Sequence, residues 1–192
     1  MERLSAALGF KLHTGWAAAV AVANGSSGLT ILLRQRIELL PADGSIPRFV
    51  FHQAAEMPPA ESADLVKRAA AASRHVAKSA VRGILRELRS YNIQVAGIPS
   101  GSTALPGDLA SILKSHALIH AAEGVLFQKA VVAACERNGV HAVCPREREL
   151  WTKIGPAMKG QIEALRQSAG PPWGADQKIA AAAALVALES FR

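Results

Sequence analysis

Residues 8–40 have the sequence LGFKLHTGWAAAVAVANGSSGLTILLRQRIELL, and their pattern is the most informative part of the chain about its architecture. It starts with a short segment that ends in a Thr-Gly bend, continues as the apolar run 17–23, and turns at the Gly- and Ser-rich residues 24–28. In residues 29–40 charged side chains alternate with apolar ones, a period of two that is typical of a half-exposed strand. The stretch therefore predicts one strand followed by a hairpin.

The rest of the chain alternates helices with short apolar strands. Apolar residues recur at steps of three and four in residues 61–89, which predicts a long helix. A second long helix is expected over 109–138, with Asp108 as its N-cap and Gly139 as its stop. The other expected elements are strands at 93–98 and 140–144, a short extended piece at 48–52, and helices at 159–168 and 175–192. This order predicts a single α/β domain over residues 1–192.

The composition indicates a folded chain in a reducing compartment. The chain has 192 residues, of which 50% are hydrophobic, and this excludes a disordered protein. Two cysteines, Cys135 and Cys144, are too few for a disulfide framework or a four-cysteine zinc site. No apolar run reaches the roughly 18 residues of a membrane span, so no membrane association is expected.

The first 23 residues allow one other interpretation of where the protein resides. Arg3 and Lys11 precede the apolar residues 16–23, which end in an Ala-x-Ala-like pattern resembling a signal peptide. Against secretion, Lys11 and His13 lie close to an apolar stretch that is very short. We therefore expect a cytoplasmic protein.

Basic side chains follow one arc of the first long helix. Arg74, Lys78, Arg82 and Arg86 are spaced by four, and the net charge of the chain is +7. Such an arc could lie along a nucleic-acid backbone, where each neutralised phosphate adds salt-dependent affinity. The ordinary alternative is a solvated face opposite the apolar stripe of the same helix, since charged helix faces are usually of that kind.

A second group of polar residues lies on the second long helix. His116, His120 and Glu123 are separated by steps of four and three, which places them on one side of the helix. Two imidazoles and a carboxylate could bind a divalent metal or relay a proton, although the helical HExxH pattern is absent. Alternatively, they form a polar network that fixes the helix against its neighbours. His52 and Glu56, four apart in an expected loop, are a weaker candidate pair.

Three local patterns resemble the ribonuclease H-like superfamily, and most closely its Holliday-junction resolvase branch. Residues 9–17 (GFKLHTGWA) resemble the first strand of that family and its turn into the second, and residues 112–143 resemble its helix-then-strand unit. Residues 173–183 (WGADQKIAAAA) resemble its last helix, which carries a metal-binding Asp. The resemblance covers nearly the whole chain and implies a five-stranded mixed sheet flanked by helices.

The resemblance also implies a site from which most acids are missing. The family holds divalent metals with acids from the first strand, the fourth strand and the last helix, and these metals activate water for phosphodiester cleavage. Only the last acid is present here, as Asp176, because Lys11 stands at the first position and residues 96–100 contain no acid. We hypothesise that Lys11 occupies the cleft in place of a metal and pairs with Asp176.

Three functions remain open at this point. The leading one is a non-catalytic, resolvase-like module that binds nucleic acid or assembles with other chains, so the expectation leans against an enzyme. The second is a divergent nuclease that uses His116, His120, Glu123 and Asp176, with Mg²⁺ or Mn²⁺ as its cofactor. The third is a structural protein that self-associates through its Ala-rich helices.

Overall fold

A computed structural model describes residues 4–25 and 28–191 of the chain. Three segments named in the sequence predictions lie wholly or partly outside the described residues. They are the first residues of the signal-like segment (1–3), the middle of the expected turn (26–27) and the last residue of the closing helix (192).

Five strands form one mixed sheet with the order β3-β2-β1-β4-β5. The strands are β1 (Ser5–His13), β2 (Trp16–Gly25), β3 (Gly28–Glu38), β4 (Asn92–Gly97) and β5 (His141–Val143). β1, β2 and β3 pair antiparallel, as the alternation in residues 8–40 predicts, whereas β4 pairs parallel to both β1 and β5. The carboxyl ends of β1, β4 and β5 therefore meet at one edge of the sheet.

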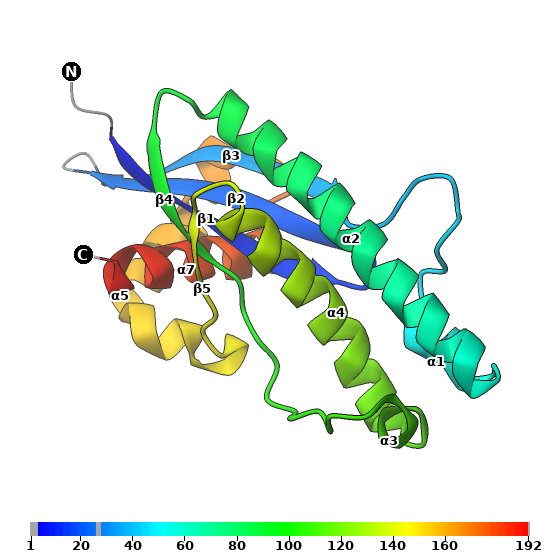
Figure 1. The fold of residues 1–192 in the computed structure, drawn as a ribbon. Helices are drawn as coiled ribbons and strands as arrows, with labels where there is room; N and C mark the ends of the chain where they lie inside the picture. Colours follow the sequence, from blue (N-terminus) through cyan, green and yellow to red (C-terminus); the bar gives the residue numbers. More distant parts are fainter. Residues whose placement is uncertain (1–3, 26–27, 192) are drawn as a thin grey trace.

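Helices cover both faces of this sheet (Figure 1). One face carries α1 (Val50–Ala55), α2 (Pro59–Glu87), α3 (Leu109–Leu113) and α4 (His116–Glu136). The 3₁₀ turn η1 (Glu147–Glu149) precedes the remaining helices, α5 (Leu150–Ala164), α6 (Arg166–Ala169) and α7 (Ala175–Ser190). α7 lies against the opposite face, and α5 packs on α7. The α/β class and the mixed five-stranded sheet expected from the sequence are confirmed.

The alternation of β1 divides the buried residues into two cores. Leu8 and Phe10 point into the core under α2 and α4, whereas Ala7 points toward α7. A period of two sends successive side chains to opposite faces, so a strand covered on both sides has few polar positions. The buried alanines and valines of β2 follow the same rule.

The sequence predicted a short extended piece at residues 48–52. This prediction is wrong, because α1 begins at Val50. Val50, Phe51 and Ala54 are buried, a spacing that suits one face of a helix. α1 packs on α2 and α4, so tertiary contact decides the structure of a segment too short to be helical alone.

Two predicted helices have different bounds. The helix expected over 109–138 is broken between α3 and α4, where Ser115 caps α4 by accepting a hydrogen bond from the Leu118 backbone N–H. The helix expected over 159–168 starts earlier, at Leu150. This helix contains a kink at Gly155, which has a φ of 73° and directly precedes Pro156. The Asp108 cap and the Gly139 stop are as predicted.

One helix passes a length and hydropathy test for a membrane span. The segment His116–Arg137 has a mean hydropathy of 1.4 over its most apolar stretch, and half of that stretch is buried within the fold. In this structure the segment packs against α2 and the sheet, as the core helix of a layered domain does. It is the only such segment among the residues that the structure describes.

Candidate functional site

The docking of α7 sets the geometry of the edge where the strands end. A Cβ atom added to Gly9 would lie 1.8 Å from the Ala180 carbonyl oxygen, and one added to Gly97 would lie 2.0 Å from the Ala183 oxygen. The helix backbone thus rests directly on β1 and β4, and only glycine permits this approach. The contact holds Asp176, one turn before Ala180, beside the end of β1.

Lys11 forms an ion pair at this edge of the sheet. Its Nζ lies 2.7 Å from both carboxylate oxygens of Glu147, with side-chain exposures of 20% for Lys11 and 41% for Glu147. The prediction that Lys11 pairs with Asp176 is therefore wrong. Glu147 was not predicted from the sequence, although it lies four residues after the end of β5, a parallel strand that delivers residues to the same edge.

Backbone contacts hold Glu147 in place. The Ser100 N–H donates to the Pro145 carbonyl at 2.9 Å, and the Glu147 N–H donates to the Ser100 carbonyl at 3.2 Å. These bonds extend the pairing of β4 and β5 by a few residues beyond the strands. As a result, the acid after β5 reaches across to the lysine on β1.

Asp176 has a different partner. Its Oδ2 lies 3.0 Å from Nε2 of His13, the last residue of β1. The His13 ring stacks on Trp16 with centroids 4.2 Å apart, and the Arg36 guanidinium lies 4.1 Å from the centroid of Trp16. Asp176 therefore lies against a histidine whose ring is stacked on Trp16, although His13 Nε2 makes no hydrogen bond with any residue that the structure describes.

These pairs do not fit the metal centre that the resemblance implies. Mg²⁺ takes oxygen ligands, and the two carboxylates of this edge each face a nitrogen group instead. Among the residues that the structure describes, no three metal-ligating side chains converge here. The donor set at this edge therefore differs from the carboxylate oxygens that a two-metal site requires.

Two hollows flank the Lys11–Glu147 pair. One, of about 510 Å³, is lined by Ser100, Glu147, Trp151 and Ile179, among others. The other, of about 390 Å³, is lined by Leu12, His120, Gln128 and Glu147, among others. The ion pair thus borders an open cleft that solutes can reach.

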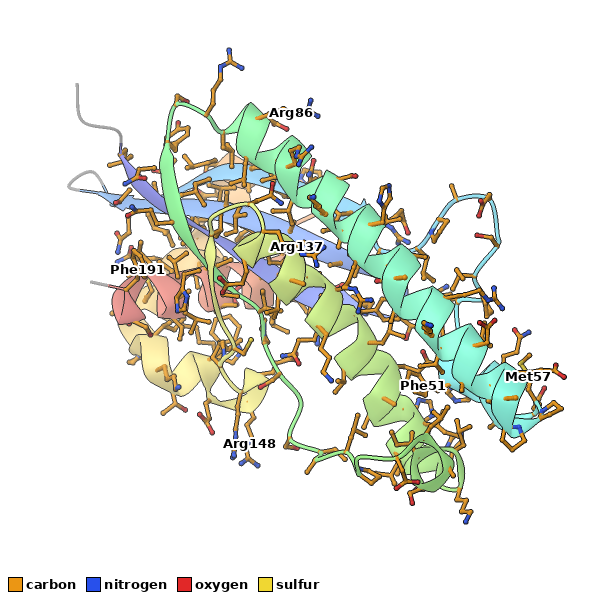
Figure 2. The ribbon with its side chains drawn as sticks, viewed as in Figure 1. Phe51, Met57, Arg86, Arg137, Arg148 and Phe191 are labelled. Carbon is orange, nitrogen blue, oxygen red and sulfur yellow. The ribbon has the colours of Figure 1, made fainter. Side chains whose placement is uncertain are left out.

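The basic arc lies on the outer side of α2. Arg74, Arg82 and Arg86 are exposed and Lys78 is half-buried, and Arg86 lies at the end of the helix near β4 (Figure 2). None of these four cations pairs with a carboxylate of the described chain. The arc therefore carries uncompensated positive charge.

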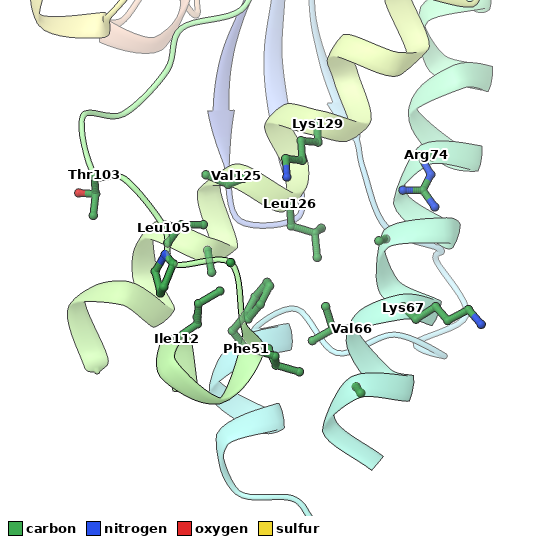
Figure 3. A pocket seen from close by; sticks show the side chains of 16 residues that line it. Phe51, Val66, Lys67, Arg74, Thr103, Leu105, Ile112, Val125, Leu126 and Lys129 are labelled. Carbon is green, nitrogen blue, oxygen red and sulfur yellow. The ribbon is translucent and has the colours of Figure 1, made fainter. Parts of the chain in front are cut away.

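Arg74 also borders a cavity of about 750 Å³ between α2, α4 and the loop before α3 (Figure 3). The walls are mainly apolar and include Phe51 and Leu126. Lys67 and Lys129 also line it, and no acid does. The positive charge of the arc thus extends to the mouth of this cavity.

The helix-α4 residues are brought together in part. His116 and His120 are exposed, whereas Glu123 is buried with 2% exposure. Its Oε1 accepts a hydrogen bond from the Phe51 N–H at 2.8 Å and lies 3.3 Å from Nδ1 of His52. The acidic partner of His52 is thus Glu123 and not Glu56.

Asp176 does not join this group. It lies on α7, whereas α4 packs on the other face of the sheet. The polar network considered for Glu123 is present, because its bonds fix α1 on α4. The four-residue site expected for a nuclease is divided between the two faces.

No known family profile matches the sequence, and no curated protein is significantly similar to it. Solved structures do match. The structure described as "T. thermophilus RuvC in complex with Holliday junction substrate" aligns with a TM-score of 0.55 at 14% identity, covering 95% of this chain and 91% of that one. A second structure, "Thermus thermophilus RuvC structure", aligns with a TM-score of 0.52 at 15% identity, covering 94% and 92%. The chain therefore shares the fold of RuvC, in which helices flank a five-stranded mixed sheet.

Proposed function

We propose that this protein is a non-catalytic, resolvase-like module that binds nucleic acid along α2. The observation that carries the proposal is the unpaired basic arc of Arg74, Lys78, Arg82 and Arg86. A row of cations that form no ion pair attracts a polyanion, which releases its counterions on binding. The net charge of +7 acts in the same direction.

Lys11 is the residue that speaks against catalysis at the strand ends. Where the resemblance expects a metal-binding acid, the chain has an ammonium group already paired with Glu147. An ammonium can balance negative charge, but it cannot produce a metal-bound hydroxide. We infer that this edge of the sheet does not cleave nucleic acid.

Self-association through the last helix receives no support from its packing. Residues 180–188 of α7 are all buried within one chain, between the sheet and α5. The Ala-rich surface of α7 is thus used in the domain's own core. A complex of several chains would need another surface.

The salt dependence of binding tests the proposal. We compare the protein with a triple variant of the arc, Arg74→Gln, Arg82→Gln and Arg86→Gln, using fluorescence anisotropy on four-way junction, duplex and single-stranded DNA and on RNA. The control removes three exposed cations from α5 and α6: Lys153→Gln, Lys159→Gln and Arg166→Gln. Each phosphate contact contributes about 0.9 to the slope of log K against log salt for duplex DNA.

The arc variant should reduce this slope by about 2 to 3, and the control should leave it nearly unchanged. The proposal fails if no ligand binds at low ionic strength, or if both variants weaken binding equally. Incubation of each ligand with Mg²⁺ or Mn²⁺ completes the test. Metal-dependent cleavage would overturn the non-catalytic assignment, and its loss in Glu123→Ala would favour the nuclease alternative.

A further inference from the structure

Three histidines from two helices meet at the end of the domain remote from α7. His52 is on α1, and His116 and His120 occupy successive turns of α4. One ring nitrogen from each lies within 4.8 Å of those of the other two. Nothing in the resolvase-like arrangement requires this cluster, since it lies on the other face of the sheet from Asp176.

The rings are arranged around a common point. Their centroids are 4.4 Å apart for His116 and His120, 4.7 Å for His52 and His120, and 5.5 Å for His52 and His116. Every pair of rings is close to perpendicular, with interplanar angles between 72° and 88°. Nitrogens bound to one Zn²⁺ at 2.0–2.1 Å lie about 3.4 Å apart in a tetrahedron, so modest side-chain rotations bring all three into range.

Glu123 supplies the group that would orient one of these ligands. Its Oε1 lies 3.3 Å from Nδ1 of His52, so a proton on Nδ1 leaves the lone pair of that ring on Nε2. A carboxylate that fixes the tautomer of a metal-binding histidine is a regular feature of zinc sites. The same oxygen accepts the Phe51 N–H, which anchors the carboxylate to α1.

Glu123 also has a carboxyl oxygen that no group of the described chain satisfies. The residue is 2% exposed, and its Oε2 has no hydrogen-bond partner among the described residues. A buried carboxylate is costly unless positive charge lies nearby. A cation held by three neutral imidazoles one shell away would supply that charge without a direct bond to Glu123.

We propose that His52, His116 and His120 bind a divalent transition-metal ion, with Glu123 as a positioning residue. Imidazole nitrogen favours Zn²⁺, Ni²⁺, Cu²⁺ and Co²⁺ over Mg²⁺ or Ca²⁺. Three protein ligands leave the fourth tetrahedral position to water or to a substrate atom. Because His116 and His120 are exposed, the ion and its fourth ligand can enter from solvent.

The site adjoins the cleft at the strand ends. His120 lines the hollow of about 390 Å³ that also contacts Glu147. A metal-bound ligand could therefore extend toward the Lys11–Glu147 pair. The metal site does not depend on nucleic-acid binding by α2, so either proposal can fail alone.

Metal titration of the untagged, chelator-treated protein tests the site. Isothermal titration with Zn²⁺ should give one saturating equivalent per chain, and Co²⁺ should give the visible absorption of a tetrahedral complex. His116→Ala and His120→Ala should each raise the dissociation constant by about 100-fold or more, since each removes a ligand. Both side chains are exposed, so the variants should keep the fold, which circular dichroism checks.

His75→Ala is the matched control, because His75 is an exposed histidine of α2 outside the cluster. Glu123→Gln keeps the size of the side chain and should weaken Zn²⁺ binding by about 10- to 100-fold. The proposal is overturned if Zn²⁺ shows no one-equivalent binding. It is also overturned if His116→Ala and His120→Ala bind as the wild type does, or if His75→Ala loses affinity to the same extent.

Discussion

On one face of the sheet the strands touch the backbone of α7, whereas on the other face large side chains separate the strands from α2 and α4. Residues 180–184 are five consecutive alanines, all fully buried, and they meet glycines on β1 and β4. The opposite core contains Phe10, Phe127 and Ile84 and leaves a cavity of about 750 Å³ at its edge.

The difference indicates which parts of the molecule can adjust. A backbone-to-backbone contact has no rotamers with which to absorb a change, so the position of α7 is tightly constrained. Large side chains beside a cavity can repack at lower cost. The α7 face thus determines where Asp176 lies, and the α2/α4 face is where new binding surfaces can evolve.

The largest expected effect is at Gly97. The Cβ of Gly97→Ala would lie 2.0 Å from the Ala183 carbonyl, so α7 must move away from the sheet. We expect a loss of about 3 kcal/mol or more in the free energy of unfolding, measured by urea denaturation. A loss below about 1 kcal/mol would show that the α7 face adjusts as readily as the other face.

The second prediction concerns a thiol in the α2/α4 core. Burial raises the pKa of Cys135 to about 12. Above about pH 9 the unfolded chain releases this proton while the folded protein retains it, so stability falls as the pH rises. We expect a loss of about 1.5 kcal/mol from this group between pH 9 and pH 10.5, measured by urea denaturation at each pH.

Comparison with variants isolates this contribution from that of other titrating groups. In Cys135→Ala the dependence should be weaker by that amount, whereas Cys144→Ala, which keeps the buried thiol, should retain most of it. Equal pH dependence in Cys135→Ala and the wild type would mean that water reaches this core.

The third prediction uses a glycine on the adjustable face. Gly83 lies within α2, four residues before its last residue, Glu87, and a Cβ added there would meet no atom within 4 Å. Gly83→Ala should raise the free energy of unfolding by about 1 kcal/mol, because alanine loses less conformational entropy than glycine when it enters a helix. Thermal denaturation measures the change in stability. A decrease would mean that the added methyl group meets a neighbouring atom, which contradicts the open space around Gly83 in the structure.

The sequence predicted elements whose pattern is local. The alternation in residues 8–40 identified β1 to β3, and the Ala-rich segment after Trp173 identified α7. α1 was missed because its six residues become helical through contact with α4, which no local periodicity records.

The same limit applied to the sites. His116 and His120 were identified because four residues separate them on one helix. His52 was not grouped with them, since it comes from a segment assigned as extended. Likewise, Glu147 is separated from Lys11 by 136 positions, so only the parallel strands β4 and β5 reveal the pair.

The smallest expected effect is at the edge shared by both faces, where Lys11 meets Glu147. Both side chains are partly exposed, at 20% and 41%, so water and salt screen their attraction. In a double-mutant cycle with Lys11→Met and Glu147→Gln, we expect a coupling energy of no more than about 1 kcal/mol, decreasing at high salt. Urea denaturation of the four proteins at low and high NaCl measures it. A coupling above about 2 kcal/mol that resists salt would mean that the pair is desolvated. The cleft would then be as tightly packed as the α7 face.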